Sequence, residues 1–314
     1  MNLLKAVPRE LAERLEKAGI KSLEALAASS PSFVAEVVDV PLERAKELCR
    51  KAWLSCGSSF TTALEFLERR RSVSYVTTGC KALDELLGGG VETKAITELC
   101  GEYGAGKTQL CHQLCVTVQL PRSSGGLSAS ALYIDSEGTF RPERLIEMAE
   151  RYGLPPKQVL ERTVYARAYS SDHQSFLVKE ACKVLEEKDV GVMVVDSLVG
   201  HFRGEFCGRE MLAERQQRLN KHIHQLLRIA EVFNVAVVVT NQVLSIPDAL
   251  APTPLASQRP VGGHVVAHGC THRVWFRKLR GPQRVARLFD SPSRPEAEAF
   301  FVIASDGIRD LEPR

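Results

Sequence analysis

Residues 101–108 have the composition and spacing of a phosphate-binding loop. The run Gly-Glu-Tyr-Gly-Ala-Gly-Lys-Thr matches the pattern G-x-x-x-x-G-K-[ST] without deviation. Its glycines let the backbone wrap so that successive N–H groups point at phosphate oxygens. These glycines are Gly101, Gly104 and Gly106. Lys107 would reach the β- and γ-phosphates, and the Thr108 hydroxyl would bind Mg²⁺. The loop therefore predicts a site for a nucleoside triphosphate.

The neighbouring sequence supplies the context that this loop needs. An apolar run over 95–99 predicts a strand that leads into the loop, and the apolar spacing after Thr108 predicts a helix that leaves it. A second apolar run, 190–195, ends in Asp196. In this class of nucleotide-hydrolysing proteins, a carboxylate at that end of a strand holds Mg²⁺ or one of its waters.

Hydrolysis also requires a group that activates or positions the attacking water. Glu137 follows a third apolar run, 131–134, after a short turn. Because the carboxyl ends of parallel strands share one edge of a sheet, we expect Glu137 to lie near Asp196 and to take this role. The alternative is a turn carboxylate that only bonds its local backbone.

Continuous apolar runs separated by helical patterns predict an α/β fold, with a largely parallel sheet covered by helices on both faces. The runs lie at 95–99, 131–134, 190–195 and 235–240. The longest predicted helix, 209–233, places Leu212, Leu219, Ile223, Leu226 and Ala230 on one stripe.

Residues 1–53 predict a separate all-α module. Ser22 and Ser30 are suited to cap helices, Pro31 to the first position of one, and Pro41 to the start of the last. Short helices joined by tight turns are typical of helix-hairpin-helix domains, whose turns bind phosphate, and equally of small adaptor modules. Residues 54–72 are expected to form a linker, and 73–314 the nucleotide-binding core.

The amino-acid composition argues against several classes of protein. Of the 314 residues, 44% are hydrophobic and 25% charged, which argues against a wholly disordered chain. No run of about 18 apolar residues predicts a transmembrane helix, and the N-terminal residues do not resemble a signal peptide. The nine cysteines include no C-x-x-C pair, so we expect reduced thiols in a reducing compartment.

The positive charge is concentrated near the C-terminal end. Residues 249–289 carry seven basic side chains and no acidic one, whereas the rest of the chain carries 34 basic and 38 acidic residues. Such a strip suggests an anionic partner. Taken alone, a solvated strand face is the simpler interpretation.

Longer motifs show a resemblance to the RecA-type strand-exchange recombinases, most closely the archaeal RadA branch and its eukaryotic relatives. The resemblance covers nearly the whole chain, including the N-terminal module, and implies a RecA-like P-loop ATPase core. The motifs are TTGCKALDELLGGGVET, YIDSEGTFRPERL, DSLVGHFRGEF, ERQQRLNKHIHQLLRIAEVFNVAVVVTNQV and RPVGGHVVAH.

The resemblance implies ATP and Mg²⁺ as cofactors. It places the catalytic glutamate on Glu137, acting with Lys107 and with Gln242, which would lie between the γ-phosphate and the second DNA-binding loop. Arg144 would stack on adenine, and His268 would share the sensing role of Gln242. The implied ATP contacts within the chain are Gly101, Gly104, Gly106, Lys107, Thr108, Gln109 and Arg144, and those of Mg²⁺ are Thr108 and Asp196.

The resemblance also implies contacts between subunits. Residues 290–296 match a cap that closes over a neighbour's ATP, through Asp290 and Pro295, and Asp290 would help to bind a monovalent cation such as K⁺. Phe60 and Ala63 match a polymerisation motif that would enter pockets of the next subunit and add a strand to its sheet. From the residues alone, Phe60 would be an ordinary core side chain.

Two segments match the DNA-binding loops of the family. The first, near 201–215, carries Arg203, Phe206, Arg209 and Arg215. The second, near 244–263, carries Arg259, together with Pro247, Pro252 and Pro254, and departs from the usual family pattern. Arginines suit backbone phosphates, and flexible loops can insert between base steps.

Three histidines four residues apart invite a metal hypothesis. They are His264, His268 and His272. Because no carboxylate lies among them, helix-face and nucleotide-sensing roles fit better than a zinc site.

The implied function is an ATP-dependent recombinase and DNA-dependent ATPase that assembles on single-stranded DNA and pairs it with a homologous duplex. Its implied partners are single- and double-stranded DNA, further copies in a filament or ring, and mediator proteins, with no membrane. The implied location is the cytoplasm, associated with the nucleoid, or the nucleus in a eukaryote.

Two alternatives remain open. A recombinase paralogue would bind DNA and remodel another protein's filament, but such chains often lack one of the sensor or loop elements present here. A ring-forming helicase or circadian-type ATPase would share the core fold, although the N-terminal module and the polymerisation motif argue against it.

Overall fold

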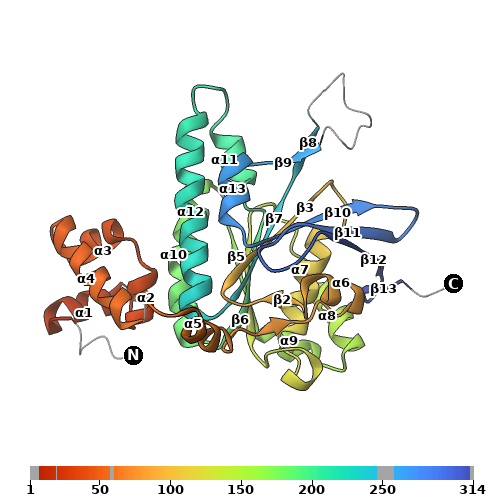
Figure 1. The fold of residues 1–314 in the computed structure, drawn as a ribbon, viewed down its shortest axis with the longest axis horizontal. Helices are drawn as coiled ribbons and strands as arrows, with labels where there is room; N and C mark the ends of the chain where they lie inside the picture. The colour runs from red at the N-terminus through yellow and green to blue at the C-terminus, as the bar shows by residue number, and fades with distance from the viewer. Residues whose placement is uncertain (1–6, 19, 57–59, 246–257, 312–314) are drawn as a thin grey trace.

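In the computed structural model, the apolar runs of the sequence form the centre of a nine-stranded sheet (Figure 1). The structure describes residues 7–18, 20–56, 60–245 and 258–311. The strands follow the order β13-β12-β11-β10-β3-β7-β6-β4-β5. From β10 to β5 every neighbouring pair is parallel, which confirms the expected largely parallel α/β core.

The parallel strands agree with the four predicted runs and add two more. They are β3 (Ala95–Gly101), β4 (Ser130–Asp135), β5 (Thr163–Arg167), β6 (Val190–Asp196), β7 (Ala236–Asn241) and β10 (His272–Lys278). An antiparallel extension, which the sequence analysis did not anticipate, contains β11 (Gln283–Asp290), β12 (Ala297–Ala304) and β13 (Gly307–Asp310). Two short ladders pair β1 (Tyr75–Val76) with β2 (Val91–Glu92), and β8 (Val243–Ser245) with β9 (Gln258–Pro260).

Helices cover both faces of the sheet because its central strands are apolar on both sides. In β6, Val192 and Val194 join one apolar cluster, whereas Met193 and Val195 join the other. The first cluster contains α6 (Lys81–Leu87), α7 (Lys107–Thr117), α8 (Pro142–Arg151) and α9 (Pro156–Glu161). The second contains α10 (Ser171–Glu187), α11 (Gly200–Glu205), α12 (Leu212–Phe233) and α13 (Gly263–Gly269). A 3-10 turn, η2, covers Arg122–Ser124.

The N-terminal module is helical, as its caps predict. Its helices are α1 (Arg9–Lys17), α2 (Leu23–Ala28), α3 (Pro31–Val38) and α4 (Leu42–Ser55). The Ser22 and Ser30 hydroxyls accept N–H groups of α2 and α3. The module packs on the second face of the core, where Lys21 forms an ion pair with Glu187 of α10 at 2.8 Å and Arg228 of α12 donates to the Ser29 carbonyl.

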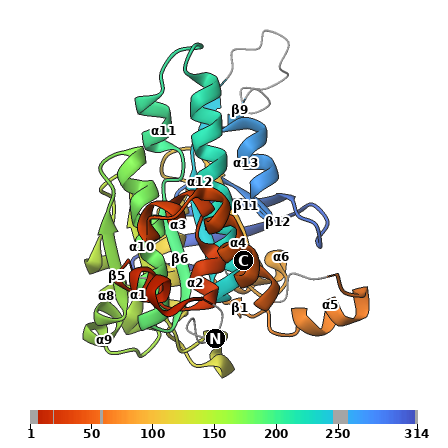
Figure 2. The same cartoon turned by 90° about the vertical axis from the view of Figure 1, so that its left-hand side faces the viewer.

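The linker contains one helix that stands away from the core. Helix α5 (Ala63–Arg70) starts at a capping box formed by Thr62 and Glu65 and has no buried residue. Figure 2 shows it projecting beside the body of the molecule. No helix within the described ranges is both long and apolar enough to cross a membrane.

Buried histidines predict a loss of stability in mild acid. His222 of α12 is fully enclosed, and burial lowers its pKa to about 4. Since the unfolded chain binds a proton at this ring near pH 6.5, stability falls as the pH drops from 6.5 towards 4. Between pH 7 and pH 5, we expect His222 to contribute about 2 kcal/mol of this loss.

Chemical denaturation at the two pH values tests this expectation. His222→Gln should reduce the difference in unfolding free energy between pH 7 and pH 5 by that amount. His224→Gln, at an exposed position two residues along the same helix, should leave the difference unchanged. An equal pH dependence in the His222 variant and the native chain would contradict the expectation.

Candidate nucleotide-binding site

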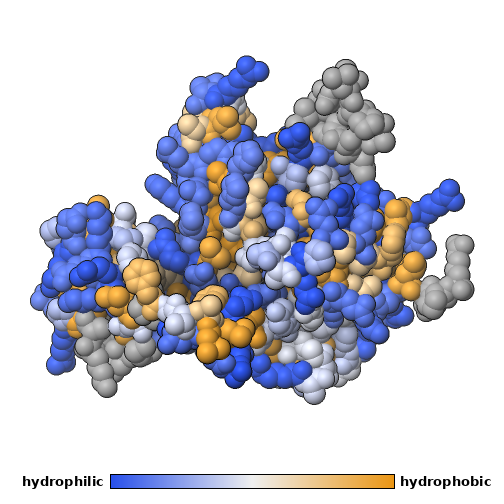
Figure 3. Space-filling model, viewed as in Figure 1, coloured by the Kyte–Doolittle hydropathy of each residue, from blue (hydrophilic) through white to orange (hydrophobic). Residues whose placement is uncertain are grey.

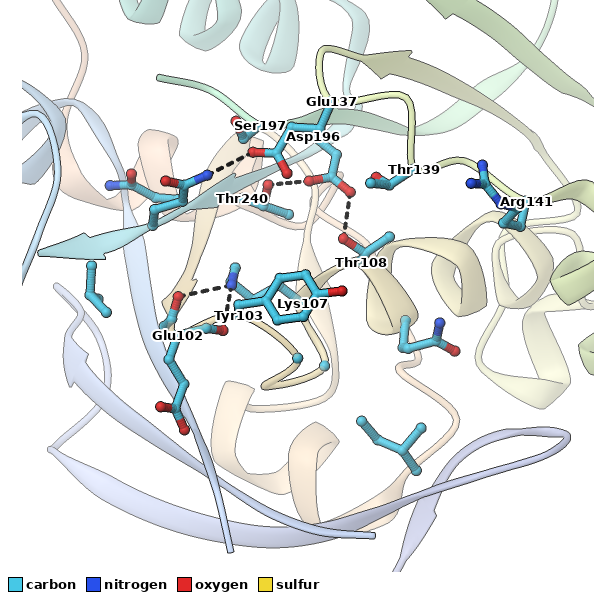
Figure 4. A pocket seen from close by; sticks show the side chains of 18 residues that line it. Glu102, Tyr103, Lys107, Thr108, Glu137, Thr139, Arg141, Asp196, Ser197 and Thr240 are labelled. Atoms are coloured by element: carbon cyan, nitrogen blue, oxygen red, sulfur yellow. Dashed lines mark hydrogen bonds between the residues drawn. The ribbon is translucent and has the colours of Figure 1, made fainter. Parts of the chain in front are cut away.

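A cavity of about 580 Å³ opens where β3, β6 and β7 end and α7 begins (Figure 4). Residues of the phosphate-binding loop line it, together with Glu137, Asp196 and Gln242. The structure therefore brings together the loop, the aspartate predicted to bind Mg²⁺, the glutamate predicted to be catalytic and the predicted sensor. Its position, at the carboxyl ends of parallel strands, is where open α/β sheets bind ligands.

The loop glycines are required by space as well as by backbone conformation. Gly101 has φ 152°, and a Cβ there would lie 2.2 Å from the Phe276 carbonyl oxygen of the neighbouring strand. At Gly106, with φ 109°, a Cβ would lie 2.8 Å from Ile303 Cδ1. A side chain at Gly101 would therefore displace the loop from β10, whereas at Gly106 the positive φ is what favours glycine.

Lys107 is held at the mouth of the loop. Its Nζ donates to the carbonyls of Gly101 at 2.8 Å and Glu102 at 2.9 Å. Burial lowers the pKa of Lys107, and the carboxylates of Asp196 and Glu137 oppose this shift. The ammonium group is therefore close enough to both carboxylates to be influenced by their charge, at the place where phosphates would bind.

Asp196 is the centre of the polar site. One carboxylate oxygen accepts the hydroxyls of Thr108 at 2.8 Å and Tyr133 at 2.7 Å, and the other accepts that of Thr240. Carboxylate and hydroxyl oxygens are ligands that Mg²⁺ prefers, so Thr108 and Asp196 fit the predicted metal site. The sequence analysis missed Tyr133 and Thr240, because their role depends on the order of strands.

Glu137 and Gln242 meet across the cavity. Gln242 Nε2 donates to Glu137 Oε1 at 3.0 Å. The turn before Glu137 is held by Asp135, whose carboxylate accepts the N–H groups of Glu137 at 3.0 Å and Gly138 at 2.7 Å. Four backbone amides in all converge on Asp135, which keeps the Glu137 carboxyl at the edge of the sheet.

A buried ion pair supports the strand that carries Gln242. Arg273 Nε lies 2.5 Å from Glu98 Oε2, and Asn241 Nδ2 donates to the other oxygen of Glu98 at 2.6 Å and to the Val261 carbonyl at 2.7 Å. The end of β7 is thereby tied to the C-terminal end of the second predicted DNA-binding loop.

Arg144 does not line the cavity. Its guanidinium donates to Gln109 Oε1 at 2.9 and 3.1 Å and to the carbonyls of Ala304 and Ser305. Gln109 lines the cavity beside the loop. The adenine-stacking role of Arg144 therefore stays a prediction, with the guanidinium beside the site and partly engaged by its own chain.

Asp290, Pro295 and His268 also lie outside this cavity. Asp290 is exposed, 3.9 Å from Arg273, and Pro295 is exposed in the segment between β11 and β12. His268 is exposed on α13, with its ring stacked on that of His264 at 6.0 Å. An exposed cap segment is free to contact another molecule, as its predicted role requires.

Only some of the residues predicted for the first DNA-binding loop are exposed to solvent. Arg203 and Arg209 are exposed, whereas Arg215 is half-buried and donates to the Phe206 carbonyl at 3.3 Å. Phe206 is only 8% exposed and packs under the Arg218 guanidinium. The Phe206 ring therefore lies in the packing beneath the loop, and its contact with DNA stays a prediction.

The second predicted loop is only partly described. Arg259 is exposed in β9, whereas Pro247, Pro252 and Pro254 lie outside the described residues. Within the described part of the chain, no group of histidine, cysteine and carboxylate side chains could hold a metal. His272 is buried, whereas His264 and His268 are exposed on α13.

Part of the basic strip is neutralised within the chain. Arg277 forms an ion pair with Glu298 of β12. Arg287 forms an ion pair with Glu296, the residue just before β12. Arg284 Nε donates to the Gly104 carbonyl at 3.2 Å. The strip is therefore partly a strand face, as the simpler interpretation held, and partly a support for the phosphate-binding loop.

Comparison with known proteins agrees with these geometries. A family model described as Rad51 matches residues 69–311. A protein of Metallosphaera sedula named DNA repair and recombination protein RadA is 46% identical over 310 residues, which cover 98% of this chain and 95% of its own. A protein of the same name from Aeropyrum pernix is 46% identical over 301 residues, covering 96% and 93%. The chain therefore belongs to the Rad51 family.

Proposed function

We propose that this protein is an ATP-dependent DNA recombinase that forms helical filaments on single-stranded DNA and catalyses homologous pairing and strand exchange in recombination and repair. The observation that carries the proposal is the bond between Gln242 and Glu137. It joins the proposed hydrolytic carboxylate to the residue just before β8, where the second predicted DNA-binding loop begins. Loss of the γ-phosphate would thus change the position of a segment that contacts DNA.

The residues around the cavity divide the chemistry of ATP hydrolysis among them. The loop amides and Lys107 bind the phosphates, and Thr108 and Asp196 hold Mg²⁺, which neutralises the charge on the transferred phosphoryl group. Glu137 accepts the proton of the attacking water, and Gln242 orients its carboxyl group. These residues support ATP hydrolysis, which is the chemical step of the proposed DNA-dependent ATPase activity.

DNA would be bound at one end of the molecule. The junction of α11 and α12 and the β8–β9 ladder lie at the same end in both views (Figures 1 and 2). Arg203, Arg209 and Arg259 are exposed there and suit backbone phosphates. Because base pairing itself reads homology, contacts to the backbone of single- and double-stranded DNA suffice.

Assembly with further copies is supported by what the linker exposes. Phe60 is fully exposed, and α5 presents Leu64, Phe66 and Leu67 in an apolar patch that Figure 3 shows at the lower edge of the molecule. Strand β5 is a free edge of the sheet, to which the segment before α5 can add. Since Ala63 already begins a helix, the added strand would end before it.

The remaining predicted contacts complete this proposal. In the filament or ring, Asp290 and Pro295 would reach a neighbour's ATP, with a cation such as K⁺ beside Asp290. Mediator proteins would act on the assembly, and the site of action would be the cytoplasm, at the nucleoid. Joint molecules formed by the pure protein would distinguish a recombinase from a mediator paralogue, and open filaments in electron micrographs would distinguish it from a ring-forming ATPase.

Lys107→Ala should abolish ATP-dependent DNA binding, because the ammonium that contacts the phosphates is lost. Binding of a fluorescent single strand, with and without ATP, measures this effect. Lys81→Ala, at an exposed lysine on α6, is the control and should bind as the native protein does. Undiminished ATP turnover by the Lys107 variant would contradict the assignment.

Glu137→Gln should retain ATP binding and lower the hydrolysis rate by about 100-fold or more, since general base catalysis contributes that much. Filaments should then persist after the native protein has released its DNA. Phosphate release gives the rate, and Glu143→Gln, an exposed residue of α8, serves as control. Native turnover by the Glu137 variant would rule out its role as the base.

Phe60→Glu should yield a smaller particle in solution, because burying an unpaired carboxylate in a partner's pocket costs several kcal/mol. Light scattering with ATP measures the mass. Leu54→Glu introduces the same charge at an exposed leucine of α4 and should leave the mass unchanged. If the Phe60 variant assembled as the native chain does, the motif would not be an assembly contact.

A further inference from the structure

A series of hydrogen-bonded polar side chains, buried at its centre, connects the linker helix to the cap segment. Its central member is His272, the first residue of β10, which is 4% exposed. His272 Nε2 lies 3.3 Å from Glu92 Oε2, and Nδ1 lies 3.0 Å from Ser291 Oγ. Arg70, in the last turn of α5, donates to Glu92 Oε1 at 2.7 Å. Hydrogen bonds therefore run without interruption from α5 to the first residue after β11.

The charge on Glu92 determines which groups donate and which accept in this series of hydrogen bonds. The pKa of Glu92 is lowered by its bond to His272 and by Arg70, against the effect of burial, so the carboxylate is charged and only accepts. The His272 ring therefore donates from Nε2 to Glu92, while its Nδ1 bonds the Ser291 hydroxyl. The 3.0 Å bond between Nδ1 and Ser291 Oγ fixes where that oxygen lies, and with it the lone pairs of Ser291 Oγ.

Those lone pairs hold the start of the cap segment. Ser291 Oγ accepts the backbone N–H groups of Ser293 at 3.3 Å and Arg294 at 3.2 Å. Beyond this turn the segment is exposed, and the side chain of Arg294 reaches back to the Gly88 carbonyl at 3.3 Å. The turn at Ser291 is thus the point from which the direction of the cap is set.

We propose that His272 is a positioning residue that couples the linker to the nucleotide cap, through Glu92 and Arg70 on one side and Ser291 on the other. The inference rests on the proposed function, which makes both ends of this chain contacts between subunits. A neighbour bound at Phe60 and Ala63 would hold α5, keep Arg70 on Glu92 and so fix the turn that presents Asp290 and Pro295. By linkage, ATP held under the cap would strengthen the linker contact in return.

Amide hydrogen exchange of the full chain, without DNA or nucleotide, tests the coupling directly. Arg70→Ala should raise exchange at the amides of Ser293 and Arg294 about tenfold, since one hydrogen bond to a charged group is lost from the chain that orders them. Arg71→Ala removes the next arginine, whose partner is Glu68 on the surface, and should not change it. Unchanged exchange in the Arg70 variant, or equal changes in both variants, would overturn the proposal.

Two isosteric substitutions separate coupling from simple packing. His272→Asn keeps an acceptor near the position of Nδ1 and loses Glu92, whereas His272→Gln keeps a donor near that of Nε2 and loses Ser291. In either background, adding Arg70→Ala should have no further effect on exchange at the cap. If Arg70→Ala still raised that exchange about tenfold, the signal would not pass through His272, and the proposal would be wrong.

Steady-state kinetics distinguishes this positioning role from simple packing, because it measures KM and kcat separately. His272→Gln should raise KM for ATP in DNA-dependent hydrolysis and leave kcat at saturating ATP unchanged, because the cap affects nucleotide retention and not the reacting atoms. A fall in kcat with constant KM would contradict the proposal. Failure of the native protein to hydrolyse ATP would contradict the proposed function instead, while the exchange measurements would still decide the coupling.

Discussion

The buried carboxylate of Asp196 is the interaction on which the site depends. A charge in the interior is stable only when hydrogen bonds replace its water. Here the hydroxyls of Thr108, Tyr133 and Thr240 supply them, from α7, β4 and β7. The requirement therefore brings three separate elements to one point at the sheet edge. It places the helix that follows the phosphate loop beside the strand that ends at Asn241, just before Gln242.

The step from Asn241 to Gln242 connects this site to the rest of the molecule. Gln242 contacts Glu137 in the cavity, whereas Asn241 contacts the buried Glu98 and the Val261 carbonyl. Neighbouring residues at a strand end point in opposite directions, so one backbone segment has one side chain in the nucleotide site and one under the second predicted DNA-binding loop. A small shift of this segment is a physical route from hydrolysis to DNA release.

Sequence alone was sufficient where the signal is local. The phosphate loop, the strand ending at Asp196, the caps at Ser22 and Ser30, and the long helix could be predicted because propensity and spacing agree there. That helix begins at Leu212, three residues later than expected. Tyr133, Asp135 and Arg273 could not be recognised, since their partners are set by strand order. Phe206 was assigned to DNA binding from the family resemblance of its segment, and the packing of its ring under Arg218 could not be foreseen from that match.

The central claim is that the nucleotide bound at this site controls the affinity of the protein for DNA. The most direct measurement is the affinity of the native protein for a single strand of DNA, in ATP, in ADP and without nucleotide, at one fixed salt concentration. The account predicts tight binding with ATP and a clear loss as the ATP is consumed or replaced by ADP. Equal affinity under all three conditions would contradict it.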